Sequence, residues 1–164
     1  MTRTTLVIDR RNLALGLLLI ASPAIAQAPP CAPPRVLFVC PAGTVKSAIA
    51  REHLKRRARE RGVAVSASSR GVHPEDHVSP ALGSRLAADG VDPGAEPVLA
   101  LAANDVSQAD IVVAFDDAAR APGLERARAW DIPSWNSEYD RAKAAMAPRI
   151  EALLDELAAR PCRP

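Results

Sequence analysis

The stretch RVLFVCPAGTVKS, residues 35–47, decides how the rest of the chain is interpreted. Its first six residues form an apolar run of β-type, which predicts a short strand buried on both faces. Pro41 and Gly43 then indicate a tight loop, and a helix is predicted from Lys46 to about Arg61. The result is a strand, a loop that opens with Cys40, and a helix, in direct succession.

This succession has the chemistry of an anion site built around a thiol. Successive loop amides and the N-terminus of a helix favour a negative charge at one spot. The same field favours the thiolate form of a cysteine at the loop entrance. A thiolate beside a bound tetrahedral oxyanion can act as an in-line nucleophile in phosphoryl transfer. The alternative for Cys40 is a buried core thiol at the end of a strand.

Apolar strands alternate with amphipathic helices along the rest of the chain. Strands are predicted over residues 63–68 and 111–115, with a shorter one near 128–130. Helices are predicted over about 79–90 and 138–160. The alternation predicts an α/β domain, a parallel sheet with helices on both faces, and neither an internal repeat nor a second domain is visible.

Residues 36–47 resemble the signature of the low-molecular-weight tyrosine phosphatases and the related arsenate reductases, in which Cys, five residues and then Arg-Ser follow the first strand. Residues 67–71 resemble the second-strand segment of that family, and residues 109–116 resemble its fourth strand. Residues 130–133, followed by a long helix, resemble the reductase-like C-terminal third. The resemblance implies a single three-layer domain with a four-stranded parallel sheet in the order 2-1-3-4, flanked by helices.

The resemblance also implies roles for individual residues. Cys40 would be the nucleophile, Ser47 would hydrogen-bond its thiolate, and Lys46 stands where the family has arginine. The family's Asp-Pro pair, which carries the general acid, corresponds to Ser134-Trp135, so Asp131 becomes the candidate acid. The oxyanion would be held by the amides of Ala42, Gly43, Thr44, Val45 and Lys46.

Several of these positions depart from the family pattern. Lys46 keeps the charge but lacks the planar fork that matches two phosphate oxygens at once. Pro41 removes one possible amide donor, and Gly43 stands where the family has Asn. Alternative interpretations are a surface residue at a helix start for Lys46 and a turn or cap residue for Asp131.

The first 26 residues have the features of an export signal. Arg3, Arg10 and Arg11 precede an apolar run over residues 13–20 that is too short to span a bilayer, and an A-x-A cleavage site ends at Ala26. Either the Sec or the twin-arginine route fits this segment, and a hydrophobic first helix is the alternative. The expected product is a periplasmic or secreted protein with no membrane association after cleavage.

The resulting organisation is a signal peptide at 1–26, a proline-rich tether at 27–34 and a phosphatase-like domain at 35–164. Export implies an oxidising compartment. We expect Cys31 and Cys162 to pair, because the ends of a compact domain often lie close together, and Cys40 to stay free. The alternative is that all three thiols are reduced.

Charge and composition narrow the class of function. Removal of the signal takes away three arginines and one aspartate, so the net charge falls from +2 to about zero, which argues against nucleic acid as a partner. No metal-ligand spacing is visible and no cofactor is expected; the oligomeric state is not indicated. Three hypotheses remain: a phosphatase-like hydrolase that acts through a cysteinyl-phosphate, an oxyanion-binding domain without catalysis, and an arsenate reductase that uses an external thiol. The expected partner is a phosphorylated substrate or an inorganic oxyanion.

Overall fold

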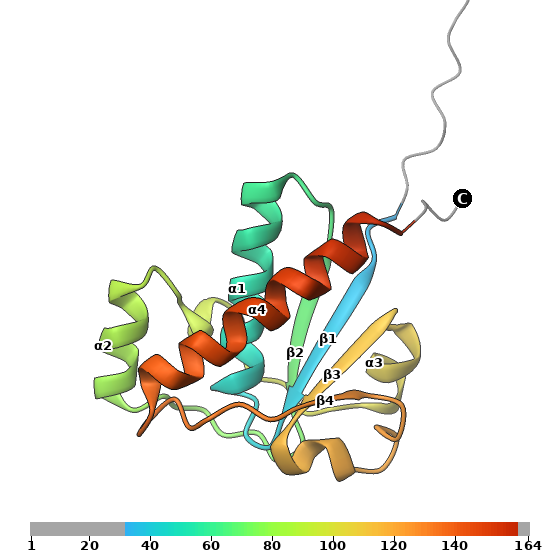
Figure 1. Cartoon of the computed structure of the whole chain (residues 1–164). Helices are drawn as coiled ribbons and strands as arrows, with labels where there is room; N and C mark the ends of the chain where they lie inside the picture. The colour runs from blue at the N-terminus through green and yellow to red at the C-terminus, as the bar shows by residue number, and fades with distance from the viewer. Residues whose placement is uncertain (1–31, 161–164) are drawn as a thin grey trace, which may run out of the picture. The chain divides into compact units, whose positions relative to one another are not determined.

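The structure, a computed structural model, describes residues 32–160, and these form one α/β domain (Figure 1). Its elements follow one another as β1 Arg35–Cys40, α1 Lys46–Arg61, β2 Ser66–Gly71, α2 Pro80–Ala88, the 3-10 turn η1 Pro93–Ala95, α3 Ala103–Gln108, β3 Ile111–Phe115, the 3-10 turn η2 Asp116–Arg120, β4 Arg128–Trp130 and α4 Tyr139–Ala158.

The four strands form one parallel sheet in the order β2-β1-β3-β4, as the resemblance implied. The register pairs Cys40 with Gly71 on one side of β1 and Val39 with Ala114 on the other. The carboxyl ends of β1, β2 and β3 therefore meet at one edge of the sheet. That edge is where open α/β sheets carry their binding sites.

The side chains of β1 alternate between two cores, one on each face of the sheet. Val36, Phe38 and Cys40 belong to the larger core, which includes buried residues of α1, α2 and α4. Leu37 and Val39 belong to a smaller core on the opposite face, which is packed against α3 and η2. Because side chains alternate along a strand, the last residue of β1 faces the helix that follows it. This alternation confirms the predicted three-layer arrangement.

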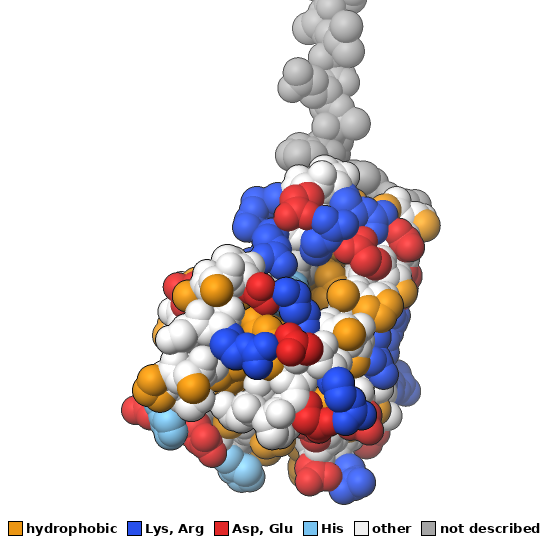
Figure 2. All heavy atoms as spheres, turned by 60° about the vertical axis from the view of Figure 1, so that its left-hand side comes forward, with side chains coloured by type: hydrophobic (Ala, Val, Ile, Leu, Met, Phe, Trp, Pro, Cys, Tyr) orange, Lys and Arg blue, Asp and Glu red, His pale blue; other side chains and the backbone are white. Residues whose placement is uncertain are grey.

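Ion pairs between helices account for much of the charge on one face of the domain. Figure 2 shows basic and acidic side chains interspersed there rather than separated. Arg57 on α1 contacts Glu151 on α4 at 2.5 Å, and Arg61 contacts Asp155 at 2.7 Å. Two of the basic residues of α1, Arg57 and Arg61, are therefore paired across the interface with α4. Exposed pairs of this kind contribute less than about 1 kcal/mol each to stability.

Two strand assignments differ from the sequence-based expectation. The second strand is β2 Ser66–Gly71 rather than residues 63–68, because its pairing with β1 begins at Ser66 opposite Arg35. Val63 and Val65, which suggested the earlier start, pack against the larger core from the connection that precedes the strand. Residues 109–116, expected to resemble the fourth strand, contain the third, β3.

Several expectations concern parts of the chain outside the described residues. The signal peptide at 1–26, most of the tether at 27–34, and both Cys31 and Cys162 are in this group. Their proposed processing and pairing stay predictions. Within residues 32–160, no helix has the length and apolar character needed to cross a bilayer.

Candidate active site

Cys40 lies at the carboxyl end of the central strand, with its sulfur enclosed by polar groups. The residue is 3% exposed. Its Sγ is 3.1 Å from the hydroxyl of Ser47, and the amide of Gly43 donates to the same sulfur at 3.1 Å. Hydrogen bonds to a sulfur stabilise it most when it is charged. Ser47 and Gly43 are therefore the two groups placed to hydrogen-bond this sulfur.

Two glycines let the loop after Cys40 close tightly on β2. Gly43 has a φ of +76°, in the left-handed region. A Cβ at Gly43 would lie 2.7 Å from the amide nitrogen of Gly71, and a Cβ at Gly71 would lie 2.8 Å from the carbonyl oxygen of Ala42. Neither position can hold a side chain without a shift of the backbone. The close approach holds the loop directly against the end of the neighbouring strand.

The carbonyl groups of the loop are used by the segment that follows β2. The amide of His73 donates to the carbonyl of Pro41 at 2.8 Å, and the amide of Glu75 donates to the carbonyl of Ala42 at 3.0 Å. These bonds fix the orientation of the first peptide planes of the loop. The loop carbonyls are thus turned towards residues 72–75.

The loop amides, in contrast, are left without acceptors. Within residues 32–160, no protein group accepts a hydrogen bond from the amides of Ala42, Thr44, Val45 and Lys46. Helix α1 begins at this point with no side-chain cap at Val45 and no acidic residue in its first turn. Unpaired amides at a helix N-terminus form a site for an anion. Four of the five residues expected to hold an oxyanion therefore offer a free donor, and the fifth, Gly43, donates to the sulfur.

Lys46 is brought to the site, where two acceptors engage its ammonium group. Its Nζ forms an ion pair with Asp116 at 2.6 Å and donates to the carbonyl of Ile132. The side chain is 17% exposed, so this pair is only partly open to solvent. Lys46 thereby links the start of α1 to the segment after β4. An incoming oxyanion would compete with Asp116 for the same cation.

Asp116 is the functional candidate that the sequence-based reasoning missed. It follows β3 directly and has a φ of +52°, the sole positive value for a non-glycine residue in the described chain. Such a conformation costs of the order of 1–3 kcal/mol and is often found at functional sites. The signal available in the sequence was its place at the end of a strand adjacent to the one that carries Cys40.

The segment after β4 contains Asp131 and Ser134, the two residues that the family resemblance connects with the general acid. Asp131 is exposed and makes no hydrogen bond or ion pair with other described residues. Ser134 accepts a hydrogen bond from the amide of Ser137 at 3.4 Å through its hydroxyl. The carbonyl of Ser134 accepts from Glu138, which leads into α4. The proposed role of Asp131 stays a prediction.

Trp135 anchors this segment in the larger core. Its side chain is 2% exposed and lies between the rings of His53 on α1 and Tyr139 on α4, with centroid distances of 6.4 and 5.2 Å. Its buried indole N–H has no hydrogen-bond partner among residues 32–160. Burial of such a large ring supplies a strong apolar anchor even with that group unpaired.

His53 is a buried histidine in a cationic environment. Burial, with smaller contributions from Arg56 and Lys143, lowers its pKa from 6.5 to about 4. Arg56 donates to its Nδ1 at 3.2 Å, which requires the neutral ring. Nearby, burial and the carboxylate of Asp89 raise the pKa of Tyr139 to about 12. Both rings beside Trp135 are therefore uncharged at neutral pH.

No metal site accompanies this geometry in the described part of the chain. Among residues 32–160, no group of three or more His, Cys, Asp or Glu side chains converges as ligands. Cys40 is the one cysteine within this range, and it is unpaired. The chemistry that the residues themselves offer is therefore that of one thiol, a ring of amides and one cation.

Comparison with solved structures shows the same fold in proteins of three activities. An arsenate reductase in a phosphate-binding state is 15% identical, with a TM-score of 0.63 over 76% of this chain and 98% of its own. A low-molecular-weight protein tyrosine phosphatase from T. tengcongensis is 21% identical, with a TM-score of 0.57 over 76% and 97%. An arginine phosphatase from Geobacillus stearothermophilus is 23% identical, with a TM-score of 0.54 over 77% and 91%.

At these identities the likeness concerns the fold, and one fold supports several chemistries. A search of curated proteins gives no match. The family model for low molecular weight phosphotyrosine protein phosphatases, however, matches residues 35–147, which include the whole sheet and the loop at Cys40. The chain therefore belongs to the low molecular weight phosphotyrosine protein phosphatase family.

Proposed function

We propose that this protein is an exported phosphatase that hydrolyses phosphomonoesters through a cysteinyl-phosphate intermediate. The proposal rests on one observation: the loop that begins with Cys40 also contains four amides without a hydrogen-bond acceptor, those of Ala42 and of residues 44–46. A nucleophile and an oxyanion cradle are the two parts that a phosphoryl transfer requires. Protein phosphotyrosine is one substrate that the family membership suggests.

The proposed reaction has two steps. In the first, the thiolate of Cys40 attacks phosphorus, a P–S bond forms, and the P–O bond to the alcohol breaks. In the second, water attacks phosphorus, the P–S bond breaks, and phosphate leaves with the thiolate restored. The loop amides would stabilise the charge on the equatorial oxygens in both steps. Ser47, at 3.1 Å from the sulfur, would stabilise the thiolate as it departs.

The weak point of this chemistry is protonation of the leaving group. Ser134 stands where the family has its acid, and a serine hydroxyl is a poor proton donor at neutral pH. We infer that Asp131 or water donates this proton, and that substrates with acidic alcohols are preferred. Such alcohols leave as anions and depend little on a general acid.

The test is a rapid-mix assay with p-nitrophenyl phosphate, whose leaving group needs no proton. We expect a burst of nitrophenol stoichiometric with protein, followed by slower turnover, and acid-stable trapping of phosphate on Cys40. The variant Cys40→Ser should abolish the burst, because the alkoxide needed for attack does not form at neutral pH. A burst of unchanged size in Cys40→Ser would show that another residue is the nucleophile.

A second candidate is an oxyanion-binding domain without turnover. It is favoured by the ion pair that already engages Lys46 and by the serine at position 134. Phosphate or vanadate should then protect Cys40 from iodoacetate while no burst occurs. Arsenate-dependent oxidation of an added thiol would instead identify an arsenate reductase. The thiol has to be supplied from outside, because Val45 occupies the place where family phosphatases have a second cysteine. If no oxyanion protects Cys40, residues 40–47 do not form an anion site.

Export is a separate part of the proposal and rests on the sequence of residues 1–26. Mass spectrometry of periplasmic and secreted protein should find an N-terminus at or near Gln27. The same sample should contain a Cys31–Cys162 disulfide and an alkylatable Cys40. Intact Met1 in the cytoplasmic fraction would contradict the export proposal.

A further inference from the structure

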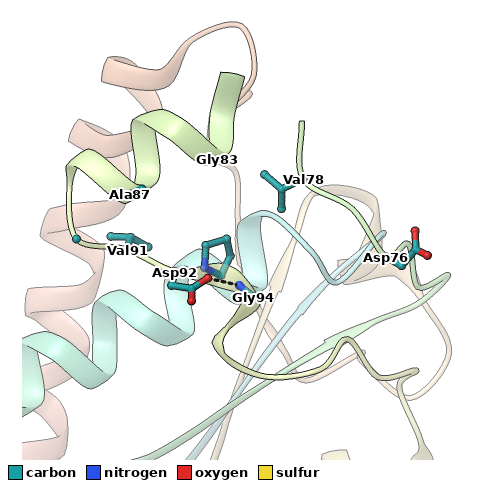
Figure 3. Close-up of a pocket in the computed structure, with 9 residues that line it drawn as sticks. Asp76, Val78, Gly83, Ala87, Val91, Asp92 and Gly94 are labelled. Atoms are coloured by element: carbon teal, nitrogen blue, oxygen red, sulfur yellow. Dashed lines mark hydrogen bonds between the residues drawn. The ribbon is translucent and has the colours of Figure 1, made fainter. Parts of the chain in front are cut away.

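A cavity with a volume of about 580 Å³ lies outside the candidate active site. Its walls come from α2, from the turn η1 and from the loop between β2 and α2. Figure 3 shows Val78 and Asp76 on the loop at one side, and Ala87 and Val91 at the other. Cavities of about 300–1,000 Å³ are the usual size of small-ligand sites.

The lining combines an apolar wall with carboxylates. Val91 and Pro93 are buried, and Val78 is half-buried and points into the space. Asp76 and Asp92 are the charged members of the lining, and none of the nine lining residues is basic. A site with an apolar wall and two negative groups is complementary to a cation on an aliphatic stem.

Both carboxylates keep capacity for a ligand. Asp92 uses one oxygen to accept from the amide of Gly94 at 2.9 Å, and its other oxygen has no donor among residues 32–160. Asp76 is fully exposed and has only a 3.4 Å contact with the ring of His77. Two arginines of α1 approach the cavity wall from behind. Arg51 donates to the carbonyl of Pro93 at 3.0 Å, and Arg56 donates to the carbonyl of Asp89 at 2.8 Å. Both cations are therefore engaged with backbone carbonyls at the wall.

The cavity and the oxyanion loop share one connecting segment. The amide of Glu75 donates to the carbonyl of Ala42 in the oxyanion loop. The cavity-lining residues Asp76 and Val78 follow Glu75 by one and three positions. Three residues of extended chain span at most about 10 Å. A peptide with its phosphate in the loop could therefore place a neighbouring side chain in the cavity.

We propose that this cavity binds the arginine or lysine side chain of a phosphorylated peptide substrate. The proposal deepens the proposed function, on which it rests for the identity of the ligand as part of a substrate. The aliphatic stem packs on Val78, Val91 and Pro93, and the cationic head lies against Asp92, with Asp76 adding a negative charge at the far rim. The protein would then select its substrates by the residues around the phosphorylated residue as well as by the phosphate itself.

The binding test uses amide NMR of the full chain carrying Cys40→Ser, so that no turnover is involved. The probes are acetyl-arginine methylamide and acetyl-citrulline methylamide, which have nearly the same shape but differ in charge. We expect the arginine probe to shift the amides of Gly83, Gly90 and Gly94 with at least tenfold tighter binding than the citrulline probe. Equal shifts with both probes, or none with either at millimolar concentration, would overturn the proposal.

Two kinds of variant make the test specific to the cavity. Gly83→Leu should block the cavity, because Gly83 lines it and a leucine side chain would occupy the space. The fold should tolerate this substitution, because the Cβ position of Gly83 has no atom within 4 Å and leucine suits a helix. The matched control Gly83→Ala should keep binding. Asp92→Asn retains an oxygen to cap Gly94 but loses the charge, so arginine binding should weaken severalfold. Full binding by Gly83→Leu would contradict the assigned position.

Turnover separates this proposal from the proposed function. With Cys40 intact, Gly83→Leu should leave kcat/KM for p-nitrophenyl phosphate unchanged and raise KM for an arginine-flanked phosphotyrosine peptide. The citrulline-flanked peptide should be insensitive to the substitution. Arginine binding without any phosphatase burst would refute the proposed function and leave the cation site standing. A burst without arginine selectivity would refute the cation site alone.

Discussion

Two segments at the carboxyl edge of the sheet, residues 40–47 and residues 131–135, differ in how many candidate functional groups they present. The loop at residues 40–47 has its sulfur, its free amides and Ser47 in place around one point. The segment at 131–135 is firmly held by Trp135, yet it has serine at the position of the family's acid and an exposed Asp131. The first loop therefore brings together the groups proposed for nucleophilic attack, whereas the second segment presents only Asp131 as a candidate proton donor.

Lys46 is the physical connection between these two segments. It begins α1 on the first loop, and its ammonium reaches Asp116 and the carbonyl of Ile132 in the second segment. The partly buried ion pair orients the cation before any substrate arrives. If the proposed function is right, this difference predicts that anion binding and thiol attack are less impaired than proton donation, and each experiment below tests one side of it.

The largest effect is expected from restoring an acid to the second segment. Ser134→Asp should raise kcat for phenyl phosphate, a substrate with a poor leaving group, by about 100-fold or more. An aspartate can also accept the hydrogen bond that Ser137 now gives to the serine. The rate with p-nitrophenyl phosphate should change little, and Ser134→Asn should match the parent. Equal rates for Ser134→Asp and Ser134→Asn would show that this position lies out of reach of the leaving group.

The second experiment damages the first loop alone. Gly43→Ala should lower the free energy of unfolding by about 2–5 kcal/mol, through left-handed strain and overlap with Gly71. Phosphate binding should fall with it. Gly62→Ala is the matched control, because that glycine also has a positive φ, of +66°, but no atom within 4 Å of its Cβ. Urea denaturation of both variants measures the difference. Equal losses would mean that the contact with Gly71 contributes nothing beyond the backbone conformation.

The third experiment uses pH to weaken the anchor of the second segment. Because His53 has its pKa lowered from 6.5 to about 4, the unfolded chain binds a proton in this range that the folded chain does not. The free energy of unfolding should therefore fall as pH decreases from 6.5 to 4, by at most about 3 kcal/mol from this residue.

Denaturation at a series of pH values measures this slope. His53→Gln should remove its contribution, whereas the exposed His77→Gln should leave it intact. An identical slope in the parent and in His53→Gln would assign the acid sensitivity to other groups. Fluorescence of Trp135, read beside that of Trp130, would report whether the second segment loosens first.

The smallest effect is expected from changes to the ion pair between Lys46 and Asp116. Lys46→Arg should tighten vanadate binding several-fold, because a guanidinium can bond two oxygens in parallel and can still pair with Asp116. Asp116→Asn should tighten it as well, since it releases the ammonium from a competing charge. Protection of Cys40 from iodoacetate gives the affinities. Weaker vanadate binding by Asp116→Asn would mean that Asp116 holds Lys46 in place for the anion rather than competing with it.

Much of this fold was predictable because local signals agreed with one another. The apolar run at 35–40, the turn residues after it and the apolar stripe of α1 predict the same strand, loop and helix that the structure contains. The sheet order came from a family resemblance and not from periodicity. The start of β2 was misplaced because Val63 and Val65 serve the core from a connection, which alternation alone does not distinguish from a strand.

The parts that escaped prediction depend on contacts far apart in sequence. Asp116 meets Lys46 across 70 positions, and its backbone conformation has no signature in the residues beside it. Arg51 is 1% exposed although it lies in a run of charged helix residues. It donates to Ser69 at 2.8 Å and to the carbonyl of Pro93 at 3.0 Å, joining α1 to β2 and to the cavity wall. Only tertiary structure reveals such partners.

The close approach of Gly43 and Gly71 also limits how this sequence can change over evolutionary time. Asparagine tolerates left-handed backbone, so its return at position 43 is conformationally permitted. Its Cβ would nevertheless lie 2.7 Å from the amide of Gly71. A return to the family residue therefore needs a prior displacement of the end of β2, and a single substitution passes through a less stable protein. Position 43 can therefore accept another residue only together with a change at the end of β2.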